Sequence, residues 1–138
     1  MYDNSVALMQ EMRSAGIEYR SDTPLEDDNL IDTIRVGWQG SNLPRTVVLM
    51  RVNDRGAHLE AELGTLAPGV RSDALELMNA LNSDYRWLKF SFDETGVVAC
   101  TSDIFLVPEV AGLFGMAALG RMFDTLNEVY PRIREVLA

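Results

Sequence analysis

The stretch from residue 77 to residue 103 constrains the fold most, because its hydrophobic period changes from helical to extended within a few residues. Apolar side chains recur every third residue at Leu75, Met78 and Leu81, which is typical of one face of a helix. A few residues later they alternate, as in a half-buried strand. A short loop containing Gly96 then leads into a second apolar run, and this combination predicts a β-hairpin. We therefore expect a helix followed directly by a hairpin.

The first strand of this hairpin has two different faces. Leu88, Phe90 and Phe92 share one face and are expected to support the core. Trp87 and Lys89 fall on the opposite face. An exposed tryptophan beside cations is typical of protein interfaces, where Trp and Arg are enriched. The alternative that remains open is a sheet face covered by a helix.

The residues before this stretch predict one helix and a three-stranded meander. The helix is expected at residues 5–14, with Asp3 or Asn4 as its cap and Gly16 as its stop. Residues 17–21 alternate as a short strand does, and the acidic stretch after them reads as a loop or a sheet edge. Further strands are expected around residues 34–38, 47–52 and 59–63. Their connections are too short for parallel crossovers, so they should pair antiparallel.

A long amphipathic helix is expected after Pro108, with Leu113, Phe114 and Ala117 beginning its apolar stripe. The stripe continues through Met122, Phe123, Leu126, Val129 and Tyr130. Three glycines, Gly112, Gly115 and Gly120, interrupt this helix. Each costs about 1 kcal/mol relative to alanine, so a close approach of another backbone is expected to offset them.

Length, cysteine content and net charge limit the classes of protein to which this chain can belong. The chain has 138 residues, which fits a single α+β domain over residues 1–138 with the element order αβββαββα. Its single cysteine, Cys100, excludes an intramolecular disulfide and reads as a small strand hydrophobe. The net charge of −9 argues against a nucleic-acid partner.

A membrane partner is not expected either. The apolar stretch 104–120 is too short to span a bilayer and is interrupted by Pro108 and Glu109, so a buried helix is predicted there. The amino terminus lacks a basic region followed by an apolar core, which predicts a cytoplasmic protein.

The side chains that could perform chemistry are scattered. His58 shares a strand face with Glu60 and Glu62, a set that could bind a divalent metal, although a single histidine favours a solvated face. Glu26, Asp27 and Asp28 lack the spacing of a calcium loop. No nucleophile elbow or phosphate-binding loop occurs. Neither an enzymatic activity nor a cofactor is therefore predicted.

Four features of the sequence together are distinctive: the element order, the run Asn79, Ala80, Leu81 and Asn82 leading into Trp87, Leu88, Lys89 and Phe90, the turn at residues 93–96, and the helix ending in Val129, Tyr130 and Pro131. In these features the chain resembles the bacterial YbjN family, which shares its fold with class I type III secretion chaperones. The resemblance implies a twisted antiparallel sheet flanked by helices and a homodimer. It also implies a role without catalysis, in assisting a partner polypeptide or in regulation, and it supplies no catalytic residues.

The expected function is therefore a non-enzymatic, dimeric protein-binding module, chaperone-like or regulatory, that holds a partner or client polypeptide on apolar sheet and helix surface. The residues expected to contact the partner are Trp87, Lys89, Leu113, Phe114 and Met116. The alternative is a small-molecule or metal-responsive sensor that uses His58, Glu60 and Glu62 or a pocket beneath the last helix.

Overall fold

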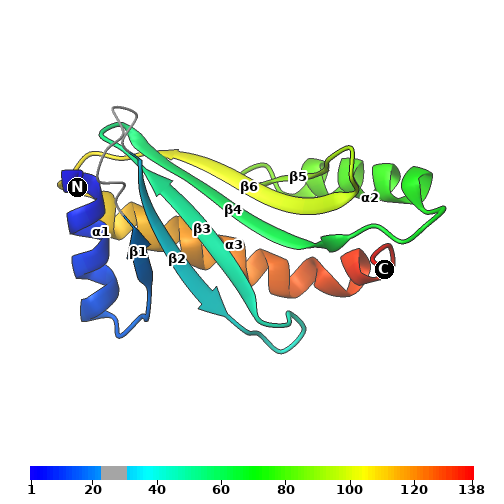
Figure 1. Ribbon diagram of the computed structural model, residues 1–138, viewed down its shortest axis with the longest axis horizontal. Helices are drawn as coiled ribbons and strands as arrows, with labels where there is room; N and C mark the ends of the chain where they lie inside the picture. Colours follow the sequence, from blue (N-terminus) through cyan, green and yellow to red (C-terminus); the bar gives the residue numbers. More distant parts are fainter. Residues whose placement is uncertain (23–30) are drawn as a thin grey trace.

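Three helices and six strands form in the part of the chain that the computed structural model describes, residues 1–22 and 31–138 (Figure 1). The acidic group Glu26, Asp27 and Asp28 lies outside these residues. The elements are α1 (Asp3–Ser14), β1 (Arg20–Asp22), β2 (Asp32–Trp38), β3 (Thr46–Val52), β4 (Gly56–Thr65), α2 (Arg71–Asp84), β5 (Lys89–Phe92), β6 (Val97–Phe105) and α3 (Ala111–Arg134). The predicted α+β order is confirmed, with β1 added as a short edge strand before the meander.

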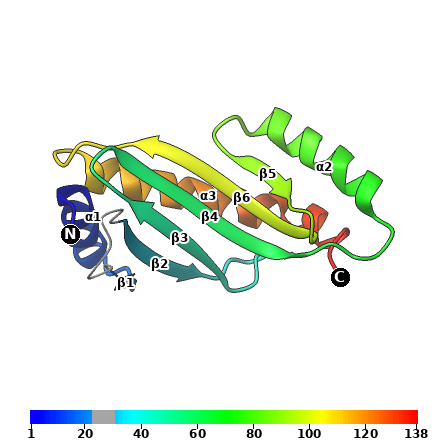
Figure 2. The ribbon, with the colours of Figure 1, turned by 45° about the horizontal axis from the view of Figure 1, so that its top comes forward.

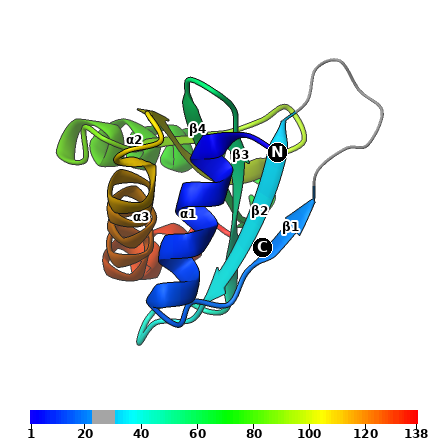
Figure 3. The same cartoon turned by 90° about the vertical axis from the view of Figure 1, so that its left-hand side faces the viewer.

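The six strands form one antiparallel sheet in the order β1-β2-β3-β4-β6-β5 (Figure 2). Helices α1 and α3 lie on one face of this sheet, and Figure 3 shows no described helix on its opposite face, which we call the uncovered face. Helix α2 packs beside β5 at the far edge. A sheet with one covered face needs apolar side chains only at alternate strand positions, which is the pattern of the sequence.

The core lies between this sheet and α3. The strands contribute side chains with at most 3% exposure at Ile34, Val36, Val48, Met50, Val52, Leu59, Ala61, Phe90, Val98 and Cys100. Helix α3 contributes Leu119, Met122, Leu126, Val129 and Ile133. Burial raises the pKa of the Cys100 thiol to about 12, so this cysteine remains an uncharged core side chain, as predicted.

Asn4 is not the cap of the first helix, and neither is Asp3. Helix α1 begins at Asp3, and the Tyr2 that precedes it makes no side-chain cap. Asn4 is buried, and its Nδ2 donates to the carbonyl oxygens of Asn53 at 2.9 Å and Leu106 at 3.4 Å. The predicted cap is wrong because a short polar side chain such as asparagine can hydrogen-bond backbone groups elsewhere in the fold as well as those at a helix start.

The first two turns of α3 present a different face to the core than predicted. Leu113 and Phe114 are 66% and 50% exposed, whereas Gly115 is buried. A Cβ atom added to Gly115 would lie 2.6 Å from Cδ1 of Leu8, and one added to Gly112 would lie 2.9 Å from Cβ of Glu11. Close contact with α1 therefore places the glycine side of α3 inward and its large side chains outward. The predicted close approach is confirmed for these two glycines but not for Gly120, which has no neighbour within 4 Å.

The apolar stretch 104–120 does not form one buried helix. Ile104 and Phe105 extend β6, and the helix begins only at Ala111. Pro108 lies in the segment that connects β6 to α3, and proline is favoured near the start of a helix. Among the described residues, no helix is long and apolar enough to cross a membrane.

The turn of the predicted hairpin is held by Asp93. Its Oδ1 accepts hydrogen bonds from the Thr95 hydroxyl at 2.7 Å and from the amides of Thr95 and Val97, both at 2.9 Å. Gly96 completes the turn with a φ of 87°, which side-chain-bearing residues rarely adopt. The Thr95 hydroxyl, and then the Val97 amide, lower the pKa of Asp93 from its ordinary value of 3.8.

This shift predicts acid sensitivity of the hairpin. A carboxylate with a lowered folded pKa stabilises the fold fully above its unfolded value of 3.8, and this contribution disappears as the pH falls through the lower folded pKa. In Asp93→Asn the contribution is absent at every pH. Urea unfolding monitored between pH 2 and pH 6 should therefore show a smaller acid-induced loss for the variant than for the wild type. Parallel pH curves would contradict this assignment.

Candidate protein-binding surfaces

The outward side of α3 carries large apolar side chains near its start. Positions 113, 114, 117 and 121 fall on one side of a helix, because residues three, four and seven apart face the same way. We call Leu113, Phe114, Ala117 and Arg121, together with Trp87, the α3 face. Its first three members are exposed, and no described element covers them. Large apolar side chains gathered on a surface are typical of interaction sites.

Trp87 joins this face through Arg121. The tryptophan is 69% exposed, and the Arg121 guanidinium lies 5.3 Å from the centre of its ring. The Trp87 carbonyl accepts a hydrogen bond from the Ser102 hydroxyl at 3.0 Å, which anchors its backbone to β6. Cation–π attraction and this anchor hold the ring over α3 while leaving most of it in solvent. Of the two interpretations of Trp87, the exposed one is therefore observed.

The structure does not bring all five predicted contact residues together. Strand β5 begins at Lys89, so Trp87 precedes it and turns toward α3, whereas Lys89 pairs with Thr101 and faces solvent on the uncovered side of the sheet. Met116 is half-buried and borders a hollow between α3 and β2. Trp87, Leu113 and Phe114 thus share one surface, and the other two lie elsewhere.

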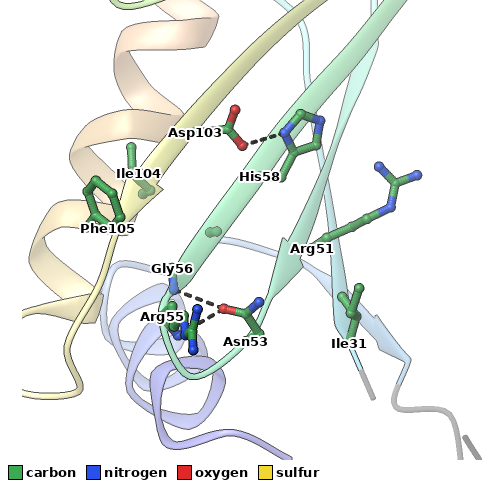
Figure 4. A pocket seen from close by; sticks show the side chains of 10 residues that line it. Ile31, Arg51, Asn53, Arg55, Gly56, His58, Asp103, Ile104 and Phe105 are labelled. Atoms are coloured by element: carbon green, nitrogen blue, oxygen red, sulfur yellow. Dashed lines mark hydrogen bonds and ion pairs between the residues drawn. The ribbon is translucent and has the colours of Figure 1, made fainter. Parts of the chain in front are cut away.

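His58 belongs to a different surface, a hollow of about 310 Å³ at the end of β4 and β6 (Figure 4). Its Nδ1 lies 2.7 Å from Oδ1 of Asp103 on the neighbouring strand. The closest carboxylate to His58 therefore comes from β6, through the pairing of residues 58 and 103, and not from its own strand. Strand pairing is a tertiary property, so spacing along the sequence did not reveal this partner.

The other two residues of the suggested metal set do not join His58. Glu60 forms an ion pair with Arg51, with 3.2 Å between Oε2 and Nη1. Within residues 1–22 and 31–138, no group of three or more His, Cys, Asp or Glu side chains is placed to hold a metal ion. Phe105 borders the same hollow and is 93% exposed, although the sequence pattern placed it in a buried helix.

Asn82 has a role that the sequence pattern alone did not reveal. Its Oδ1 accepts the Phe90 amide at 2.6 Å, and its Nδ2 donates to the Phe90 carbonyl at 2.9 Å. Strand β5 is at the edge of the sheet, so these outward backbone groups have no neighbouring strand among the described residues. Tyr85 packs edge-on to the Phe90 ring at the same junction, and burial, followed by the charge of Glu128, raises its pKa. In the sequence, an asparagine near the end of a helix predicts only that the helix ends there, and not which backbone groups its side chain binds.

Comparisons with known proteins agree with this architecture. A chain of the heterodimeric ExoU–SpcU complex from the type III secretion system of Pseudomonas aeruginosa has the same fold, with a TM-score of 0.56 and 19% sequence identity. The match covers 93% of this chain and 95% of that one, and it confirms the predicted secretion-chaperone-like fold. A search of curated proteins gives no significant match. The model of the YbjN family, "Putative bacterial sensory transduction regulator", matches residues 6–135. The chain therefore belongs to the YbjN family.

Proposed function

We propose that this protein is a non-enzymatic, dimeric polypeptide-binding module that acts in the bacterial cytoplasm as a chaperone-like or regulatory factor. The family described as a sensory transduction regulator, and the fold shared with a chain of a two-protein secretion complex, both support a role in protein binding. The side chains with functional potential also fit this role, because they are exposed apolar and cationic groups rather than a nucleophile and base in a cleft.

The observation that carries the proposal is the α3 face. It combines a tryptophan, an arginine stacked on it, and the exposed Leu113 and Phe114, and Trp and Arg are the residue types that most often dominate binding energy at interfaces. Phe114 and Arg121 are separated by about 10 Å along the helix axis, with the exposed Ala117 between them on the same side of the helix. An apolar surface is complementary to itself, as a two-fold interface requires. A second copy of the chain is its proposed occupant.

Replacing Trp87 by alanine should weaken this dimer without unfolding the protein. Removal of a central aromatic anchor typically costs about 2 kcal/mol of association, roughly 30-fold in Kd. Light scattering on a dilution series should show a dimer for the wild type at micromolar concentration and a shift toward monomer for Trp87→Ala. Leu75→Ala is the matched control, because Leu75 is 51% exposed but lies on α2.

Two results would count against the proposal. If the wild-type protein is monomeric at micromolar concentration, the proposed dimer is contradicted. Equal dimerisation of the wild type, Trp87→Ala and the double variant Leu113→Asp/Phe114→Asp removes the α3 face as its site. Circular dichroism of each variant checks that a change in mass does not reflect unfolding.

A further inference from the structure

Two adjoining hollows open at the sheet edge where α1 ends. One, of about 400 Å³, lies between α3 and β2 and has an apolar lining that includes Val36, Trp38, Met116, Leu119 and Phe123. The other, of about 730 Å³, lies over the end of the uncovered sheet face and is lined by arginines. Ile17, Glu18, Gly37 and Arg45 border both hollows. We call the combined depression the Arg45 groove.

The lining of this groove has more basic than acidic residues, unlike the whole protein, since its four arginines outnumber its two described acidic residues, Glu18 and Asp124. The chain has 12 basic and 21 acidic residues, yet the second hollow is lined by Arg13, Arg20, Arg35 and Arg45, with Glu18 as its one acidic lining residue within the described part of the chain. Arg35 forms an exposed ion pair with Asp22 at 3.6 Å. Arg20 and Arg45 form none with any described side chain. Clustered arginines, two of which form no ion pair with any described side chain, favour an anionic partner on an otherwise acidic protein.

The backbone of the groove also offers hydrogen-bonding groups. Strand β1 pairs with β2 only at Thr33–Arg35, so the rest of β2 pairs with no described strand on that side. The Asn53 amide donates to the Gly56 carbonyl in the β3–β4 turn. In an antiparallel sheet, successive residues of a strand direct their N–H and C=O groups alternately to the strands on its two sides, and the register of β4, β3 and β2 carries this alternation from Asn53 to Gly37. By that alternation the N–H and C=O of Gly37 point away from β3 and toward the open edge. Open edges of this kind pair with the main chain of extended peptides.

The side chain of Arg45 lies against the backbone of Gly37. A Cβ atom there would lie 2.6 Å from Nη2 of Arg45. The guanidinium therefore lies directly over the Gly37 backbone, where it can contact a carboxylate on a chain that pairs with this edge.

The third glycine of α3, Gly120, lies at the border of the apolar hollow. A Cβ atom on Gly120 would meet nothing within 4 Å. The Trp38 and Phe123 rings, whose centroids are 5.3 Å apart, line the same hollow. The absence of a side chain at this position keeps space open next to aromatic and methionine side chains, which suits a large apolar group.

From these observations we infer that the Arg45 groove binds an acidic polypeptide segment, with carboxylates on the arginines and a large apolar side chain in the hollow that Gly120 borders. Successive side chains of an extended segment point to opposite sides, so acidic and apolar residues should alternate in it. The inference rests on the proposed polypeptide-binding function and names the client chemistry. A nucleic acid is disfavoured by the net charge of −9.

The test uses fluorescence anisotropy with three labelled peptides of equal length. One alternates acidic residues with Phe and Leu, the second has Lys in place of the acids, and the third has Ser in place of Phe and Leu. The first should bind at least roughly tenfold more tightly than either of the others, and its affinity should fall with added salt. Arg45→Glu should weaken this binding by about tenfold or more, whereas Arg55→Glu, an equal charge change in the His58 hollow, should leave it unchanged.

A second variant separates binding from folding. Gly120→Leu places an apolar side chain at an exposed position that borders the apolar hollow, where an added Cβ meets nothing within 4 Å, and replaces a helical glycine by a better helix former, so its Tm should not fall. It should nevertheless weaken binding of the acidic peptide.

Each remaining outcome overturns the inference. Equal affinity for the basic peptide, unchanged binding by Arg45→Glu, or unchanged binding by a folded Gly120→Leu would each do so. Failure of all three peptides to bind would overturn it too. The dimer formed through the α3 face is measured separately by light scattering, so these failures leave that part of the proposed function standing.

Discussion

Gly115→Val is expected to lower the free energy of unfolding by about 3 kcal/mol, because a side chain at this position has no space. The first added atom would lie 2.6 Å from Cδ1 of Leu8, which is fully buried in α1. The remaining atoms would push α1 and α3 apart along the contact that orders the amino-terminal end of the fold. Urea unfolding monitored by circular dichroism measures this loss directly.

Gly120 provides the matched control, since it lies in the same helix with open space around it. Gly120→Ala should raise the free energy of unfolding by about 1 kcal/mol, the ordinary gain in helix propensity. Opposite signs at the two glycines would confirm that close packing, and not helix propensity, requires Gly115. A stabilising Gly115→Val would contradict the observed contact between the helices.

Asn82→Ala is the second substitution expected to have a large effect. It removes both partners of the Phe90 backbone, and a part-buried amide and carbonyl left without partners should lower the free energy of unfolding by about 2 kcal/mol. It also exposes the outer edge of β5 to pairing with other chains. Urea unfolding should show the destabilisation, and light scattering should show concentration-dependent species larger than the dimer.

Asn79→Ala is the control, because Asn79 is an exposed asparagine on the same helix that hydrogen-bonds no described residue through its side chain. It should change the free energy of unfolding by less than about 0.5 kcal/mol. If the two variants behaved alike, the hydrogen bonds from Asn82 to β5 would have no structural importance.

The two sheet edges thus differ in a way that bears on function. At β5 the side chain of Asn82 occupies the backbone groups that a partner strand would use. At β2 the strand continues past β1, and arginines surround the unpaired part. Strand addition by a client is therefore expected at β2 and not at β5.

The hairpin shows what the hydrophobic pattern of the sequence predicts and what it does not. Alternation at Leu88, Phe90 and Phe92 predicts the buried face of β5 correctly, and Gly96 predicts the turn. Helical period places a helix before it, although Leu75, a member of the predicted stripe, is exposed. The period identifies the element type securely because it depends only on neighbours along the chain.

The binding surfaces were less predictable for the same reason. The sequence predicts Trp87, Leu113 and Phe114 as contact residues. Only the packing of α3 against the segment before β5 brings Arg121 to Trp87 and so places the tryptophan beside the helix. The arginines of the Arg45 groove come from α1, β1, β2 and the residue before β3, and no spacing in the sequence groups them. Convergence of distant segments is a property of packing.

Local chemistry along the chain is enough to determine the order of helices and strands, the antiparallel pairing of the meander, and the identity of the hairpin. These depend on period, turn residues and connection length, each of which acts over a few neighbours. Tertiary packing decides which side of α3 is buried. Seen along the sequence, the large side chains Leu113 and Phe114 are the stronger hydrophobic signal, but contact with α1 requires the glycines to face inward. The exposed apolar surface of this protein follows from that steric requirement.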